Sequence, residues 1–206
     1  MHLHTTTVST PMGPFTLLVD GGGVCAAGFT DRPGTLQRRL DPRRRAATLR
    51  PALDPDQVAG RLRAYLAGEA GALDGVAVAQ PGDPAQQAAW AALRMIPAGE
   101  TISYRQLGAL ADLADPATDP LGAQAAGQAC AGNHVAVIVP CHRVVRADGR
   151  LGGYGWGVPR KAWLLEFEST ARADRPSVPE TRTRSNREES TWPWPTARRT
   201  RSGKGR

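Results

Sequence analysis

A cysteine, a histidine and an arginine follow one another at Cys141-His142-Arg143, directly after Pro140. The apolar residues 135–139 before them are typical of a short buried strand, whose ladder Pro140 would end because proline has no amide proton. Cys141 would then lie at the exit of a rigid element. Basic neighbours favour the thiolate, so the thiol could act as a nucleophile. These four residues alone fit a buried structural cysteine equally well.

The composition is that of a globular protein with a basic C-terminal segment. The chain has 206 residues, of which 41% are hydrophobic, enough for one substantial core or two small ones. Its three cysteines do not make a disulfide framework, and no apolar run approaches the roughly 20 residues of a membrane span. We therefore expect a cytoplasmic protein with free thiols and no membrane contact.

The positive charge is concentrated in residues 171–206. They carry 10 Lys+Arg against 4 Asp+Glu, which is +6 of the net charge of +7. The segment is rich in Arg, Thr, Ser and Pro, with Trp192 and Trp194 as its large apolar anchors, so it is predicted to be a disordered tail. Such a tail either adds non-specific affinity for phosphates or is solvated without a role.

Residues 1–80 are predicted to form a β-rich domain. Short alternating runs at 5–10, 15–19 and 24–29, around the Gly21-Gly22-Gly23 turn, predict a hairpin or meander. Residues 38–50 are Arg-rich and lack an apolar stripe, so we expect them to be exposed. Val58, Leu62, Tyr65 and Leu66 recur at helical spacing and predict a helix that ends at Gly68.

Residues 81–170 are predicted to form a second, largely helical domain. Helices are expected at 86–95, after a cap at Ser103, and at 122–130. The last helix consists of small residues, which permit close approach to another helix, the commoner case, or to DNA. Two short helices followed by a strand region suggest a helix-turn-helix or winged-helix arrangement.

This second domain resembles the methylated-DNA-protein-cysteine S-methyltransferases, also called O6-methylguanine-DNA methyltransferases. The resemblance is carried by residues 96–104, Gly132-Asn133 and residues 138–145, 153–157 and 160–168. In the first domain only residues 9–14 are closely similar to the family. The resemblance implies an α+β fold, with a small ribonuclease-H-like domain at 1–80 and a winged-helix-like catalytic domain that binds DNA at 81–170.

The resemblance also implies a reaction and the residues that perform it. The family transfers the methyl group of O6-methylguanine, and less efficiently of O4-methylthymine, from double-stranded DNA to its own cysteine. Cys141 would be the acceptor, His142 would act on it through a water, Glu168 would orient His142, and Asn133 would hold the cysteine loop. The thioether product is not reopened, so each chain would act once and without a cofactor.

A base inside the duplex must be flipped out before its oxygen faces the sulfur. In the family, the tyrosine that matches Tyr104 crowds the adjacent phosphate, and Tyr154 with the backbone of Gly155 would line the base pocket. Without the family match, both tyrosines would be interpreted as packing residues and Asn133 as a turn residue.

Two positions depart from the family pattern. Gln124 stands where the family has an arginine that fills the gap left in the base stack, so weaker flipping and weaker DNA affinity are expected. The alignment there is complicated by an insertion-like segment at residues 115–120. Trp156 stands where many members have glycine. It is predicted to narrow the pocket rim and to favour methyl over benzyl groups.

Two other functions and one metal site compete with this interpretation. A non-catalytic sensor of alkylated DNA is compatible with Gln124, but sensors of that type usually lack the cysteine. A Cys-His hydrolase would need an oxyanion pocket, for which the sequence gives no sign. His2, His4 and Cys25 have no diagnostic zinc spacing, so no metal site is predicted, and we expect a monomer.

Overall fold

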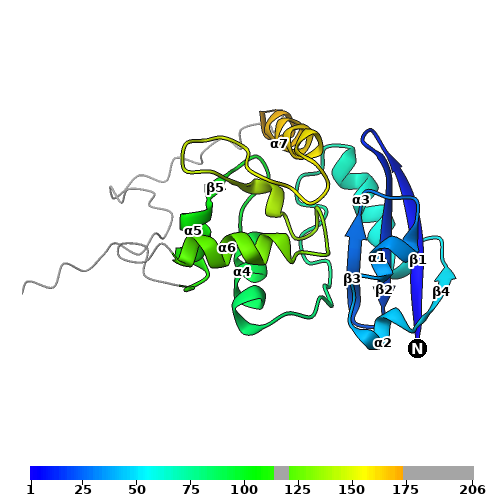
Figure 1. The fold of residues 1–206 in the computed structure, drawn as a ribbon. Helices are drawn as coiled ribbons and strands as arrows, with labels where there is room; N and C mark the ends of the chain where they lie inside the picture. The colour runs from blue at the N-terminus through cyan, green and yellow to red at the C-terminus, as the bar shows by residue number, and fades with distance from the viewer. Residues whose placement is uncertain (114–120, 174–206) are drawn as a thin grey trace, which may run out of the picture. The chain divides into compact units, whose positions relative to one another are not determined.

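The structure, a computed structural model, describes residues 1–113 and 121–173 (Figure 1). The insertion-like segment at 115–120 and residues 174–206 of the predicted tail lie outside the described residues. The predicted start of the tail is wrong, because residues 171–173 form the end of the last helix. The strands are β1 (His2–Thr10), β2 (Gly13–Asp20), β3 (Gly23–Gly28), β4 (Thr48–Pro51), β5 (Ile102–Ser103) and β6 (Val144–Val145). The helices are α1 (Pro33–Gln37), α2 (Pro42–Arg45), η1 (Pro55–Gln57), α3 (Val58–Leu66), α4 (Pro84–Arg94), α5 (Tyr104–Leu110), α6 (Leu121–Ala131), η2 (Cys141–Arg143) and α7 (Val158–Ala173). The fold is therefore mixed α+β, as expected.

The N-terminal part is built on a four-stranded sheet in the order β3-β2-β1-β4 (Figure 1). Its first three strands are antiparallel neighbours, which confirms the predicted meander, and β4 runs parallel to β1. Both faces of the sheet are buried, because Leu17 belongs to one core cluster and Leu18 to another. Residues 38–50 lie mostly at the surface, as predicted, except for the buried Leu40.

The predicted helices of the second region are present, and local capping explains where two of them begin. Asp83 caps α4 by accepting a bond from the Gln86 amide at 2.8 Å, and Ser103 caps α5 by accepting one from the Gln106 amide at 3.2 Å. In both cases the residue at the third helical position bonds back, which completes a capping box. The helix after Ser103 thus starts at Tyr104, one of the expected DNA-binding residues.

The small residues of α6 allow it to pack closely against α5. A Cβ atom added at Gly108 would lie 2.7 Å from the carbonyl oxygen of Gly122, too close for any side chain. This confirms the interpretation that the small residues serve helix packing. In the part of the chain that the structure describes, no helix has the length and apolar character needed to cross a membrane.

The predicted strand at residues 135–139 is wrong, because these residues form a buried turn. Only Val135 makes a β-bridge, to Ala27 on the edge strand β3. Val137 has a φ of 69°, which no extended strand allows, and the amide of Ile138 donates to the carbonyl of Ala136 at 2.8 Å. The five side chains are apolar because they are buried, with at most 4% of each exposed.

Cys141 consequently begins a turn of 3-10 helix, η2, and does not lie at the end of a strand. After this turn, β6 pairs in parallel with β5, with Val144 opposite Ile102 and Val145 opposite Ser103. Because α5 starts directly after Ser103, this short ladder fixes the cysteine turn beside the first residue of α5.

Candidate active site

Asn133 fastens the turn that carries Cys141. Its side-chain Nδ2 donates to the carbonyl of Val139 at 2.8 Å and to the Cys141 Sγ at 3.2 Å. Its Oδ1 accepts a bond from the amide of Val135 at 3.0 Å. The amide group therefore spans the turn from its first residue to the thiol, where a residue that holds the cysteine loop is expected to lie.

The Cys141 thiol is partly buried, and burial raises its pKa above the ordinary 9.0. The hydrogen bond from Asn133 and the positive charge of Lys161 oppose this effect without reversing it. The thiol is therefore protonated at neutral pH and must pass its proton to a base when it attacks an alkyl group.

His142 and Glu168 form a buried pair next to this cysteine. The distance from His142 Nε2 to Glu168 Oε1 is 3.1 Å, and the two side chains are 0% and 1% exposed. Burial alone would raise the pKa of Glu168, but hydrogen bonds and charge from His142 and Arg143 hold it well below its usual range. An ionised carboxylate only accepts hydrogen bonds, so Nε2 carries the ring proton and the Nδ1 lone pair is free to accept another.

The imidazole is suited to act as a neutral base. Burial lowers the pKa of His142 below 6.5, although Glu168 partly opposes the shift. Nδ1 is buried and has no hydrogen-bond partner among the described residues. The ring bonds to Glu168, and no hydrogen bond joins it to the sulfur among the described residues. Its action on Cys141 through a water stays a prediction.

Three further residues support the site. Tyr65 and Lys161 were not predicted, and Arg143, expected as a basic neighbour of the thiol, instead binds Glu168. Arg143 donates to both carboxylate oxygens of Glu168, from Nε at 3.0 Å and from Nη2 at 2.7 Å, and its Nη1 binds the carbonyl of Ile96. The hydroxyl of Tyr65 on α3 donates to Glu168 Oε1 at 2.7 Å. One sequence feature could have pointed to Tyr65. It is a hydroxyl-bearing residue in the apolar stripe of a helix, where phenylalanine would pack as well.

Lys161 is the third of these residues, and its side chain is fully buried. Its Nζ donates to the carbonyl of Val144 at 2.6 Å and more weakly to that of Gly153 at 3.4 Å. Burial lowers the pKa of this ammonium group. The side chain thus ties the strand after the cysteine turn to the loop before Tyr154, and its charge favours the Cys141 thiolate.

Tyr154, expected to line the base pocket, and Tyr104, expected to crowd the adjacent phosphate, both lie near the cysteine turn. The Tyr154 ring is edge-on to the His142 ring, with centroids 6.4 Å apart, and its buried hydroxyl has no hydrogen-bond partner among the described residues. Tyr104 is partly buried, with its hydroxyl close to Gly152. Gly155 is exposed, as is Gln124 on the face of α6 away from its buried residues.

The indole of Trp156 packs against the N-terminal sheet. A Cβ atom at Gly28 would lie 2.0 Å from Trp156 Cζ2, so only glycine leaves room for the ring. The guanidinium of Arg39 lies 4.9 Å from the ring centroid, and Phe29 meets it edge-on at 6.4 Å. The narrowing of the base pocket by Trp156 stays a prediction, since these contacts concern the sheet.

The residues considered for zinc do not come together. Cys25 lies in a core cluster with Leu3, whereas His2 and His4, on either side of Leu3 in β1, are exposed. Burial raises the pKa of Cys25 to about 12, and its sulfur bonds to the carbonyl of Leu18 at 3.3 Å. Within residues 1–113 and 121–173, no group of three or more His, Cys, Asp or Glu side chains is placed to hold a metal ion.

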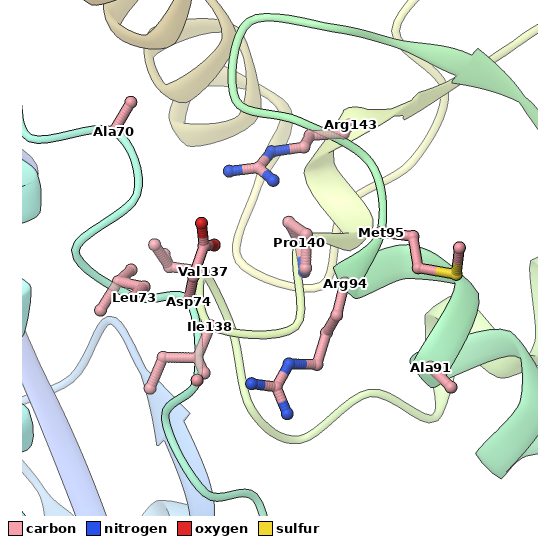
Figure 2. A pocket seen from close by; sticks show the side chains of 11 residues that line it. Ala70, Leu73, Asp74, Ala91, Arg94, Met95, Val137, Ile138, Pro140 and Arg143 are labelled. Atoms are coloured by element: carbon pink, nitrogen blue, oxygen red, sulfur yellow. The ribbon is translucent and has the colours of Figure 1, made fainter. Parts of the chain in front are cut away.

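A cavity of about 370 Å³ adjoins the cysteine turn (Figure 2). Val137, Ile138, Pro140 and Arg143 contribute to one part of its lining, and the figure shows Arg143 and Arg94 on either side of Pro140. Cys141 is not among the lining residues.

Comparisons with known proteins point to a single family. Residues 84–170 match the family described as "6-O-methylguanine DNA methyltransferase, DNA binding domain". The chain is 54% identical to the "Bifunctional transcriptional activator/DNA repair enzyme Ada" of Escherichia coli over 84 residues. The matched stretch covers 41% of this chain and 22% of Ada. The chain is 39% identical over 176 residues to a "Methylated-DNA--protein-cysteine methyltransferase" of Mycobacterium bovis, covering 84% of this chain and 96% of that protein.

Solved structures give the same result. The O6-methylguanine methyltransferase of Mycobacterium tuberculosis superposes with a TM-score of 0.63 at 35% identity, over 82% of this chain and 93% of that one. The same organism's protein in complex with DNA gives a TM-score of 0.66 at 34% identity, over 83% and 94% of the two chains. The chain is 39% identical to the Mycobacterium bovis protein and covers 96% of it. It therefore belongs to the family of methylated-DNA–protein-cysteine methyltransferases.

Proposed function

We propose that this protein repairs DNA by moving the methyl group of O6-methylguanine, and less efficiently that of O4-methylthymine, irreversibly onto its own Cys141. The observation that carries the proposal is the geometry around the thiol. Asn133 bonds to Sγ at 3.2 Å, and the neighbouring His142 is a buried neutral base whose Nε2 is held by Glu168 at 3.1 Å. A nucleophile, a base and a carboxylate that orients the base are the components that such a displacement requires.

In the proposed reaction, the sulfur attacks the methyl carbon opposite the guanine oxygen. The S–C bond forms as the C–O bond breaks, and the electron pair of the broken bond stays with the purine. The thiol proton passes through a water to Nδ1 of His142, which becomes a cation beside the ionised Glu168. The departing guanine takes up a proton in turn. The thioether product keeps the methyl group, so each chain accepts one group and needs no cofactor.

Double-stranded DNA that contains the alkylated base is the proposed substrate. Tyr104, at the start of α5, would crowd the phosphate next to the damaged nucleotide and favour its rotation out of the stack. Tyr154 and the backbone of Gly155 would line the base pocket, with Trp156 near its rim. Gln124, exposed on α6, would enter the gap that the base leaves.

We also propose a fold type for each of the two domains. Residues 1–80 would form the family's ribonuclease-H-like domain and residues 81–170 a winged-helix-like domain. The four-stranded sheet supports the first, and the close packing of α5 on α6, followed by the β5–β6 ladder, supports the second. A monomer in the cytoplasm is the proposed working state.

Mass measurement of the intact protein tests the proposed function. The chain is incubated with a duplex that contains one O6-methylguanine, and with the same duplex that contains guanine as control. A gain of one methyl group, with the first duplex only, supports the transferase. Binding to the methylated duplex without any gain in mass would instead support the non-catalytic sensor.

A further inference from the structure

A tyrosine from outside the matched domain reaches the reaction centre. Tyr65 lies on α3, before residue 84, where the family match begins. Its hydroxyl donates to Oε1 of Glu168 at 2.7 Å, across 103 residues of sequence. The side chain is 1% exposed, and its ring packs edge-on against Phe167 with a centroid distance of 5.4 Å. Phenylalanine would make the same ring contact, so the hydroxyl serves the carboxylate.

Three donors share the Oε1 atom of Glu168. Tyr65 Oη and Arg143 Nη2 both lie at 2.7 Å, whereas His142 Nε2 lies at 3.1 Å. A carboxylate oxygen offers about two lone-pair directions, so the third donor is held less tightly. The hydroxyl of Tyr65 and the ring of His142 therefore compete for the same oxygen.

We propose that Tyr65 is a positioning residue for methyl transfer, whose hydroxyl fixes the Glu168 carboxylate and weakens its bond to His142, so that His142 stays an unprotonated base. The inference rests on the proposed function. The other groups that face this carboxylate are the amide of Gly99, at 3.2 Å from Oε2, and the Arg143 guanidinium. The cations that act on the His142 ring are Arg143 and Lys161. Replacing Tyr65 leaves all of these groups in place.

The variant Tyr65→Phe tests this role, because it removes the hydroxyl and keeps the ring. The single-turnover rate of methyl transfer from a duplex with O6-methylguanine is measured from about pH 5 to pH 9, together with the Kd for the duplex. Without this donor, Oε1 attracts the imidazolium more strongly, so the acid midpoint of the rate is expected to move to higher pH. The rate at neutral pH should fall roughly three- to tenfold, with an unchanged Kd.

The control variant is Phe167→Leu, which removes the ring contact with Tyr65 but no hydrogen-bond donor. It should lower the thermal stability and leave the acid midpoint where it is in the wild type. A Tyr65→Phe profile identical to that of the wild type would overturn the inference, as would the same shift in Phe167→Leu. A wild-type chain that takes up no methyl group overturns the proposed function as well, which separates the two failures.

A second measurement does not depend on whether the variant folds. Titration of the His142 ring by NMR in the wild-type protein should find it neutral at pH 7, with a midpoint below the ordinary 6.5. A ring that is already protonated at pH 7 would overturn the inference.

Discussion

The Glu168 carboxylate concentrates the polar contacts of the reaction centre on one buried residue. Tyr65, Gly99, His142 and Arg143 all donate hydrogen bonds to it, and its side chain is 1% exposed. Arg143 binds it with two nitrogens, which fixes the plane of the carboxylate as well as its position. The orientation of the His142 ring follows from that plane, because its Nε2 must point at Oε1.

The Glu168→Gln variant is expected to lose stability in a pH-dependent way. A carboxyl group whose pKa is lower in the folded than in the unfolded protein stabilises the fold above its ordinary value of 4.5. This contribution is lost as the pH falls toward the folded pKa. At pH 7 the variant should be about 3 kcal/mol less stable, since the Arg143 guanidinium is left without its carboxylate. Thermal unfolding should show the gap shrinking below pH 4.5, whereas a gap independent of pH would contradict this account.

The sequence predicted the site residues that lie within the family motifs. It did not predict the residues that contact them from elsewhere in the chain. Asn133, Cys141, His142 and Glu168 could be named because the family resemblance covers them, and the structure brings all four together. Tyr65 could not be named in the same way. Its hydroxyl meets Glu168 only after 103 intervening residues have folded, and its helical spacing is that of an ordinary core residue.

Among the elements, the turn at residues 135–139 shows where local pattern fails. A β-branched run is typical of a strand, yet Val137 adopts a left-handed φ of 69°, which costs roughly 1–3 kcal/mol. Burial of its side chain and the bonds that Asn133 makes across the turn offset this strain. These stabilising contacts are tertiary contacts, so no local sequence pattern reveals them. The β1–β3 meander and the capped helices α4 and α5 depend on local signals and were predictable.

The contact between Trp156 and β3 gives a prediction for the loop that carries Tyr154. Gly28→Ala would place a Cβ atom 2.0 Å from the indole and force the loop away from the sheet. We expect a loss of about 1–3 kcal/mol in the free energy of unfolding and a slower methyl transfer. The matched control is Gly21→Ala, where nothing lies within 4 Å of the added Cβ. Equal effects of the two substitutions on the transfer rate would contradict the prediction.

The α6 helix carries a second prediction. Gln124 is exposed, and the sequence resemblance predicts that it replaces an arginine of the family. Gln124→Arg should therefore increase the rate of methyl transfer from duplex DNA about tenfold. Gln128→Arg adds the same charge at another exposed position of α6 and serves as the control. Single-turnover kinetics on duplex DNA measure the rate of methyl transfer in both variants and in the wild type. If Gln124→Arg leaves the rate unchanged, Gln124 does not limit base flipping.

For the molecule as a whole, the sheet and the helical region share one core. The main cluster of buried residues includes Leu17 and Val24 from the sheet together with Leu93 and Leu164 from the helices. The edge strand β3 also bonds to the turn before the cysteine, because the Ala27 amide donates to the carbonyl of His134 at 2.8 Å. Substitutions in the sheet are therefore expected to reach the reaction centre, although they lie outside the matched domain.

The basic tail is a property of the whole chain, and its contribution can be measured by removing it. Residues 174–206 carry 9 Lys+Arg and 4 Asp+Glu. A chain that ends at Ala173 should bind duplex DNA more weakly, with a shallower dependence of log Kd on log salt concentration, because fewer counterions are released. Methylated and unmethylated duplexes should be affected alike. A salt dependence equal to that of the full chain would show that the tail is solvated without a role.

The central claim is that Cys141 is the single methyl acceptor, and peptide mapping after reaction tests it most directly. The chain has three cysteines, and burial raises the pKa of each, that of Cys25 to about 12; among them Cys141 is the one that Asn133 bonds, next to His142. After exposure to excess duplex with isotope-labelled O6-methylguanine, we predict one label per chain, all of it on the Cys141 peptide, and none in Cys141→Ser. Label on Cys25 or Cys130, or label retained by Cys141→Ser, would contradict the account.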